Sequence, residues 1–326
     1  MTTPVNFSPI PFSESIRAHL LNTENPIIVT GGSGWIGRAT ISMLQDALGA
    51  TFTRRVKVFC SSEKSFIVDG SKVHALSFSE LNAHGASNAL LLHFAYLTRE
   101  KSALMPLQDY VKINSEISSF VFDFAVKTKI DGLFMPSSGA VYTADKTLEE
   151  NVTTNPYGFL KVQDEKLFSE LDTDKKAIPR LFNLSGPFIT KTRSYALGSI
   201  ITDILKGGPI NINSDRPVIR SYVHVRDLVN LSFAILLGLA PSPSSPFDTA
   251  GANNLEIGDL AVLSKTILGY PNIQVNRPTL NSSKEPDVYV GNGEQYKALA
   301  ERAKITPSGI EKEITDTADY LRRFGL

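Results

Sequence analysis

The sequence predicts an α/β protein with a doubly wound parallel sheet, followed by a smaller C-terminal lobe. Two observations carry this prediction. Up to about residue 187, short apolar runs alternate with longer amphipathic stretches, which is the pattern of strand, helix, strand units. From about Ser185 onward, glycine and proline punctuate shorter elements, and a Pro/Ser loop occupies 241–246.

The expected strands share a nearly continuous apolar character, as in a sheet that is covered on both faces. They are Pro26–Thr30, Val56–Cys60, Val73–Leu76, Ala89–Phe94, Gly132–Pro136 and Ile178–Leu184. The expected helices are Arg38–Leu48, Asp109–Lys127 and Pro156–Leu171, with a further helix at Ser13–Leu21 ahead of the first strand.

Composition and charge exclude several classes of protein. The 33 lysines and arginines balance 33 aspartates and glutamates, so no net field attracts nucleic acid or an anionic membrane. The longest apolar runs, such as Phe233–Ala240, are shorter than the roughly 20 residues that span a bilayer. Residues 1–24 lack the pattern of a signal peptide, and the single cysteine, Cys60, cannot form an internal disulfide. We therefore expect a cytoplasmic protein that binds neither nucleic acid nor a membrane.

A glycine-rich loop lies between the first strand and the helix that follows it. Its glycines are Gly31, Gly34 and Gly37. Glycines at this spacing permit a tight turn, let the backbone approach a pyrophosphate, and let the helix pack closely on the strand. The helix start then offers free amides and the positive end of the helix dipole to the phosphates, and Trp35 and Ile36 of the loop are expected to contact the cofactor. The loop predicts a Rossmann-type NAD(P) site, and the alternative is a plain turn.

The end of the second strand bears on the choice between NAD and NADP. NAD sites usually carry an acid there, which binds the ribose hydroxyls. Here Ser61, Ser62 and Lys64 occupy that position, and Arg38 follows the last glycine of the loop. These hydroxyls and cations favour NADP over NAD, because they suit a 2′-phosphate. Solvated surface charges are the alternative interpretation of Arg38 and Lys64.

These observations divide the chain into three regions. The N-terminal leader is 1–25. The NAD(P)-binding Rossmann domain is 26–187, with a later returning strand near 246–250. The remainder, 188–326, is mainly a substrate-binding lobe.

A phenol and an ammonium lie four residues apart at Tyr157 and Lys161. On a helix they share one face, and the ammonium should lower the pKa of the tyrosine toward the range of a proton carrier. Ser138 follows an apolar strand, at the sheet edge where open parallel sheets bind ligands. It could hydrogen-bond a reacting oxygen beside Tyr157. Taken singly, the pair could be a chance surface pair and the serine a turn residue.

The chain resembles the extended short-chain dehydrogenases, which include the NAD(P)-dependent nucleotide-sugar epimerases and dehydratases. The residues that carry this resemblance are Thr30–Gly37, His93–Ala95, Asn114, Ser138, Tyr157, Lys161, Arg180–Pro187 and Arg220–Asp227.

The resemblance implies roles for individual residues. Ser138, Tyr157 and Lys161 would be catalytic, and Lys161 would also hold the nicotinamide ribose. Asn114 would support Lys161 through water.

It also implies contacts for the rest of the site. Phe94 and Ala95 would lie beside the cofactor. Asn183 and Arg220 would contact the substrate diphosphate, which suits a guanidinium fork. By themselves, Asn183 could be a loop amide and Arg220 a salt-bridge partner. The family further implies a homodimer built from the helices near Asp109–Lys127 and Pro156–Leu171.

Two of the five histidines, His93 and His224, are interpreted as structural. His93 ends an apolar strand and His224 lies in an alternating run. No histidine or carboxylate pair has metal-ligand spacing, so no metal is expected.

Gly139 and Ala140 decide among the chemistries that the resemblance implies. The dehydratases of this family carry an Asp-Glu pair at that position, and glycine and alanine cannot act as acid or base. A 4-ketoreductase of a nucleotide-linked sugar is favoured by the missing ribose-binding acid, with a nucleotide-sugar 4-epimerase as the alternative. A non-catalytic NAD(P)-binding sensor or scaffold is a third possibility, although such proteins commonly lose the tyrosine or lysine.

Overall fold

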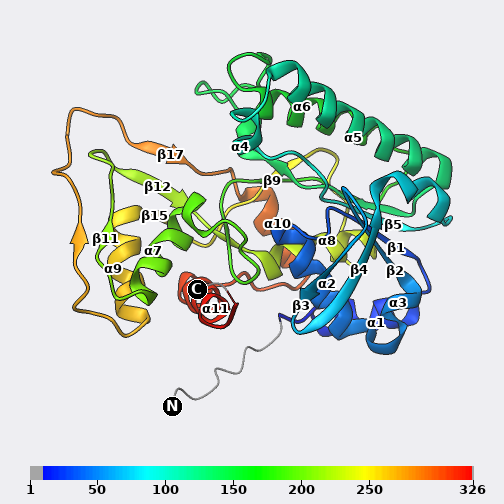
Figure 1. Ribbon diagram of the computed structural model, residues 1–326, viewed down its shortest axis with the longest axis horizontal. Coiled ribbons are helices and arrows are strands. Elements are labelled where there is room, and N and C mark those ends of the chain that lie inside the picture. Colours follow the sequence, from blue (N-terminus) through cyan, green and yellow to red (C-terminus); the bar gives the residue numbers. More distant parts are fainter. Residues whose placement is uncertain (1–9, 325–326) are drawn as a thin grey trace.

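The computed structural model describes residues 10–324, and a seven-stranded sheet forms the centre of its larger lobe (Figure 1). From edge to edge the strands are β3 (Lys64–Val68), β4 (Ser71–Ser77), β2 (Val56–Cys60), β1 (Ile27–Thr30), β5 (Leu90–His93), β6 (Gly132–Phe134) and β8 (Lys176–Ala177). All neighbours are parallel except β3 and β4. The strand order reverses between β1 and β5, where open sheets of this kind bind their ligands. This confirms the predicted Rossmann-type sheet.

Helices cover both faces of the sheet. One face carries α1 (Glu14–Asn22), α2 (Trp35–Leu48) and α8 (Val225–Leu236), and the other carries α5 (Leu107–Thr128) and α6 (Pro156–Ser169). Each face of the sheet has its own apolar core, because successive side chains of a strand such as β1 point to opposite faces. Ile27 and Val29 point into the first core, while Ile28 joins Val121 and Phe124 of α5 in the second.

The segment ahead of the first strand is part of the fold. Helix α1 agrees with the expected Ser13–Leu21 to within one residue at each end, and residues 1–9 of the leader lie outside the described residues. Ile16 and Leu20 are fully buried against α2 and α8. The Ser13 amide donates to the Asn230 side chain at 2.8 Å, which ties α1 to a helix more than 200 residues later.

A three-stranded sheet extends the carboxyl edge of the large sheet. It is formed by β14 (Phe247–Asp248), β9 (Pro179–Leu181) and β7 (Ser137–Ser138). Strand β14 lies within the returning segment expected near 246–250. Because α8 and β14 both come after residue 188, the later part of the chain contributes directly to the larger lobe.

The smaller lobe contains short strands and several helices. Its strands are β10 (Leu184–Ser185), β11 (Ile210–Asn211), β12 (Val218–Ser221), β13 (Val223–His224), β15 (Asn254–Glu256), β16 (Val275–Asn276) and β17 (Asp287–Tyr289). Its helices are η4 (Thr192–Ser194), α7 (Ala196–Leu205), α9 (Ile257–Ile267) and α11 (Ile310–Phe324), whereas α10 (Glu294–Arg302) packs on β14 of the larger lobe. The remaining short helices are η1 (Gly49–Thr51), α3 (Phe52–Arg55), η2 (Phe78–His84), α4 (Arg99–Ser102) and η3 (Gly139–Val141).

The strand boundaries differ from expectation in two places. The expected strand Ile178–Leu184 is not continuous: it contains β9 and the first residue of β10, which belong to two different sheets, and β8 ends just before it. The antiparallel hairpin of β3 and β4 was not expected over its full length, because only Val73–Leu76 was predicted as a strand; residues 64–67 are mostly exposed. Among residues 10–324 no helix combines the length and apolar character needed to cross a membrane.

Replacing Leu20 with alanine tests whether α1 is a structural part of the large lobe. Leu20 is 0% exposed, so Leu20→Ala should lower the free energy of unfolding by about 2–5 kcal/mol. The neighbouring Leu21 is 52% exposed, and Leu21→Ala should stay within about 0.5 kcal/mol of the parent. Urea unfolding followed by circular dichroism measures both, and equal effects would show that α1 does not pack as described.

Candidate active site

The glycine loop lies at the end of β1, and two of its three glycines are packed closely against neighbouring backbone. Gly31 has a φ of +71°, and a Cβ there would lie 2.4 Å from the Phe94 carbonyl carbon and 2.5 Å from the Ala95 nitrogen. A Cβ on Gly37 would lie 2.7 Å from the Gly31 oxygen. Around Gly34 only that same oxygen comes near, at 3.5 Å. Two glycines therefore permit close packing, and the third leaves backbone open at the start of α2.

Helix α2 begins at Trp35 after Gly34, and no side chain caps its first amides. Ile36 and Gly37 follow in the same first turn. The Trp35 indole donates to the Pro187 carbonyl at 2.7 Å and so ties the loop to the second lobe. An uncapped helix start beside an open glycine is an anion-binding arrangement.

The four polar residues expected near an adenosine ribose fall into two groups in the structure. Ser61, Ser62 and Lys64 are exposed just beyond the carboxyl end of β2. Arg38, in contrast, donates to the carbonyls of Ser33 and Ile67, both at 2.9 Å. Its guanidinium therefore holds the β3 strand against the glycine loop.

The first turn of α6 packs directly on the chain after β7. Asn155 caps the helix by accepting from the Gly158 amide at 3.0 Å, and its amide donates to the Ala140 carbonyl at 2.9 Å. A Cβ on Gly158 would lie only 2.0 Å from that carbonyl oxygen. Only glycine permits this approach, which brings Tyr157 up to Ser138.

Ser138 faces two phenols. Burial raises the pKa of Tyr157, and hydrogen bonding from Ser138 acts in the opposite direction. The pKa of Tyr289 is raised in the same way, again against a hydrogen bond from Ser138. Tyr289 comes from β17 and was missed at the sequence level, because no local pattern links it to a strand about 150 residues earlier.

The expectation that Lys161 lowers the pKa of Tyr157 is wrong for this structure. The Lys161 ammonium lies 3.4 Å from a carboxylate oxygen of Asp164 and 3.4 Å from the Pro136 carbonyl. It also lies 3.5 Å from the centre of the Tyr96 ring. A neighbouring negative charge offsets the ammonium, so burial decides the direction of the tyrosine pKa.

Asn114 has a different contact from the one implied. It is fully buried, and its side chain accepts from the Leu97 amide at 2.9 Å and donates to the Leu97 carbonyl at 3.3 Å. Tyr110 donates to the same carbonyl at 2.8 Å. Asn114 thus fixes the loop that carries Tyr96 over Lys161.

A buried network of ion pairs and hydrogen bonds includes Ser137, the residue before Ser138. Glu165 of α6 accepts two bonds from Arg180, at 2.8 and 2.7 Å, and one from the Ser137 hydroxyl at 2.5 Å. Arg180 also donates to Tyr142 at 2.5 Å, and Tyr142 donates to Asp248 of β14 at 2.9 Å. The network joins α6 to β7, β9 and β14.

Of the two residues expected at a substrate diphosphate, Asn183 lies between β9 and β10 and Arg220 lies in β12. Asn183 donates to the carbonyls of Ser221 and Tyr289, at 3.1 and 3.3 Å. Arg220 of β12 is paired with the Asp287 carboxylate at 3.2 Å. The residues are brought together, and the Arg220 guanidinium has an acidic partner in this arrangement.

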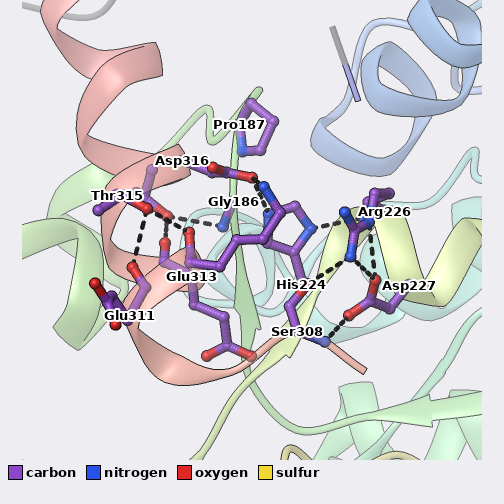
Figure 2. A network of polar contacts seen from close by, with 12 residues as sticks. Gly186, Pro187, His224, Arg226, Asp227, Ser308, Glu311, Glu313, Thr315 and Asp316 are labelled. Atoms are coloured by element: carbon purple, nitrogen blue, oxygen red, sulfur yellow. Dashed lines mark hydrogen bonds and ion pairs between the residues drawn. The ribbon is translucent and has the colours of Figure 1, made fainter. Parts of the chain in front are cut away.

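Both histidines are structural in their contacts. His93 bonds to the Thr30 hydroxyl at 2.8 Å, and burial, with Lys161, lowers its pKa to about 3. Figure 2 shows His224 between two partners. Its ring accepts a hydrogen bond from the Arg226 backbone amide at 3.0 Å, and its other ring nitrogen lies 3.2 Å from the Asp316 carboxylate of α11. A Cβ on Gly186 would lie 2.7 Å from the His224 ring.

The sheet order, the glycine loop and the helix start that follows it define an NAD(P)-binding α/β protein of the Rossmann class. The model of the NAD dependent epimerase/dehydratase family matches residues 27–243. The chain belongs to this family, which confirms the resemblance and the expectation of an NAD(P)-dependent enzyme.

Relatives agree with this membership. The chain is 24% identical to a UDP-glucose 4-epimerase of Mycoplasma genitalium, over 94% of this chain and 98% of that protein. It is 26% identical to a UDP-glucose 4-epimerase of Azospirillum brasilense, over 65% of this chain and 68% of that protein.

Solved structures share the fold. A UDP-N-acetylglucosamine 4-epimerase from Methanobrevibacter ruminantium superposes with a TM-score of 0.68 at 19% identity, covering 92% of this chain and 99% of that chain. A UDP-glucose 4-epimerase from Thermotoga maritima gives a TM-score of 0.67 at 20% identity, covering 91% and 99%.

Adding a methyl group to Gly158 tests the contact between α6 and η3. Gly158→Ala should lower the free energy of unfolding by about 1–3 kcal/mol, because the new Cβ overlaps the Ala140 carbonyl. Gly208→Ala is the matched control, since nothing lies within 4 Å of its added Cβ. Thermal unfolding of both variants measures the difference, and a Gly158→Ala protein as stable as the control would contradict the described contact.

Glu313 in the Figure 2 network predicts a pH dependence. Burial, with the nearby charge of Asp227, raises its pKa from the ordinary value of 4.5 to about 9. Between these values the folded state holds a proton that the unfolded state has lost. Stability should therefore fall as pH rises, by at most about 1.4 kcal/mol per pH unit.

Glu313→Gln removes this titration. Its stability advantage over the parent should grow from pH 5 to pH 9. The exposed Glu311→Gln on the same helix should show no such trend. Urea unfolding at several pH values measures the trend, and parallel curves for parent and Glu313→Gln would exclude a protonated Glu313.

Proposed function

We propose that this protein is an NAD-dependent nucleotide-sugar 4-epimerase, with UDP-glucose as the first substrate to test. The supporting observation is the pairing of the Tyr157 phenol with the Ser138 hydroxyl at the carboxyl edge of the sheet. The names of the two relatives support the choice of reaction and substrate.

The residues at the sheet edge fit a dinucleotide. The backbone is open at Gly34, the α2 amides are uncapped, and Gly31 brings the Phe94 and Ala95 backbone close to the loop. Two features favour NAD over the NADP that the strand end suggested. Arg38 is bonded to backbone carbonyls, and related structures are described with bound NAD. NAD supplies a reversible hydride acceptor.

Three side chains of this protein would carry out the proton transfer and hold the substrate oxygen. Tyr157 exchanges a proton with the sugar 4-hydroxyl, and Ser138 hydrogen-bonds the same oxygen. Lys161 supplies positive charge one helical turn away. Because Gly139 and Ala140 have no acid or base, the site has no group there that could eliminate water. The hydride that the sugar C4 gives to bound NAD would return to the same carbon, so the reaction would have no net oxidation or reduction.

A ketoreductase would use the same three side chains. The sequence favoured it because the ribose-binding acid usual in NAD sites is missing after β2. The comparisons favour the epimerase alternative, since both relatives carry that name. A sensor or scaffold role is less favoured, because the chain keeps both Tyr157 and Lys161.

Substrate binding would use Asn183 and Arg220 on the nucleotide side. Arg220 would exchange Asp287 for the diphosphate, as a guanidinium fork suits either group. We also propose a homodimer through α5 and α6, where Ile113 and Val126 are exposed apolar residues, and sedimentation velocity would test it.

Tyr157→Phe tests the reaction. The variant should interconvert UDP-glucose and UDP-galactose about 10²–10⁴-fold more slowly, because the proton carrier is lost. Proton NMR of the sugar anomeric signals measures the rate, and NADPH absorbance in the same samples detects net reduction.

Tyr270→Phe is the control, since Tyr270 is exposed in the distal part of the smaller lobe. Unchanged interconversion in Tyr157→Phe would exclude the proposed role. Consumption of NADPH without interconversion would identify a ketoreductase instead.

A further inference from the structure

Beside the proposed catalytic residues Ser138, Tyr157 and Lys161 lies a buried carboxylate that has no role in the proposed reaction. Asp164 lies one helical turn after Lys161 on α6, and both side chains are only 7% exposed. A buried carboxylate is costly unless it is paired and hydrogen-bonded. Its presence beside the lysine therefore needs a reason.

The two oxygens of Asp164 have separate partners. One oxygen accepts from the Ser118 hydroxyl of α5 at 2.6 Å, and the other lies 3.4 Å from the Lys161 ammonium. Both oxygens act as acceptors, which is the pattern of an ionised carboxylate. Burial raises the pKa of Asp164, and Lys161 and Ser118 act against this effect. Ser118 is itself buried and fixes the carboxylate from the neighbouring helix.

Among residues 10–324, Asp164 is the carboxylate that pairs directly with Lys161, and Glu165 adds a weaker effect that also raises the pKa of Lys161. Glu165 is bonded to Arg180 and Ser137. His93, at the end of β5, is held neutral by a pKa of about 3. Tyr96 presents the face of its ring to the ammonium, and the pKa of its phenol is raised by burial.

Further contacts come from the remaining elements around this pair. The chain after β6 offers the neutral Pro136 carbonyl, and α5 offers Tyr110, whose phenol has a pKa raised by burial to about 12. Burial lowers the pKa of Lys161, and Asp164 acts against this effect.

We propose that Asp164 is the fixed counter-ion that keeps the Lys161 ammonium protonated inside the protein, and so acts as a positioning residue for Lys161. The consequence for catalysis rests on the proposed function. There, Lys161 must carry its charge to hold the ribose hydroxyls of the cofactor. Without Asp164, the buried lysine would lose its proton at lower pH.

The test is an NMR titration of Lys161 in the protein without substrate. The Cε signal of Lys161, assigned with Lys161→Arg, is followed against pH in the parent and in Asp164→Asn. The midpoint should fall by about one pH unit or more in Asp164→Asn, the size of effect that a close opposite charge produces. Glu170→Gln removes an exposed carboxylate just after α6 and should leave the midpoint unchanged. An equal midpoint in parent and Asp164→Asn would overturn the proposal.

A second measurement needs no variant, in case Asp164→Asn does not fold. In the parent at neutral pH, the Asp164 carboxyl carbon should show the shift of an ionised carboxylate while Lys161 shows that of an ammonium. A neutral pair at that pH would overturn the proposal in the same way.

Catalysis gives a separate readout. The alkaline limb of the kcat/KM profile with UDP-glucose should move to lower pH in Asp164→Asn, because the required ammonium is lost earlier. A lower rate with an unmoved limb would indicate a merely structural role and count against the proposal. The expected Lys161 shift in a protein without epimerase activity would instead refute the proposed function and leave the ion pair standing.

Discussion

The contact between the first turn of α6 and the Ala140 carbonyl is the constraint on which the candidate site depends. Helix α6 carries Tyr157 and Lys161, while the chain after β7 carries Ser138. The side chain of Asn155 bonds to both segments, and Gly158 removes the atom that would hold them apart. The relative position of phenol and hydroxyl is therefore set mainly by backbone approach, which loops alone would not fix as closely.

Helix α6 also carries two consecutive buried carboxylates that serve different neighbours. Asp164 faces Lys161 of its own helix, whereas Glu165 reaches Arg180 of β9. Each is paired, so neither leaves an uncompensated charge in the interior. One helix thereby combines a local electrostatic effect on the reacting groups with a rigid connection to the sheet.

Much of this arrangement could be predicted from local sequence. The glycine spacing, the short apolar strands and the Tyr157 and Lys161 pair are patterns within a few residues of chain. The contacts of Tyr289 with Ser138, of Arg38 with Ile67 and of Asn114 with Leu97 join segments that only the tertiary fold brings together. The pKa of Tyr157 was mispredicted for the same reason, because Asp164 was visible in the sequence but its orientation toward Lys161 was not.

The placement of α8 and β14 has a consequence for how the protein is made. Both elements complete the large lobe, yet they are translated only after the first part of the smaller lobe, from β10 to β13. The apolar surfaces of α1, α2 and β6 that α8 covers must stay exposed on the ribosome until then. Non-local pairing of this kind slows folding and leaves time for aggregation. Nascent chains that stop near residue 190 should therefore depend on chaperones far more than the finished protein does.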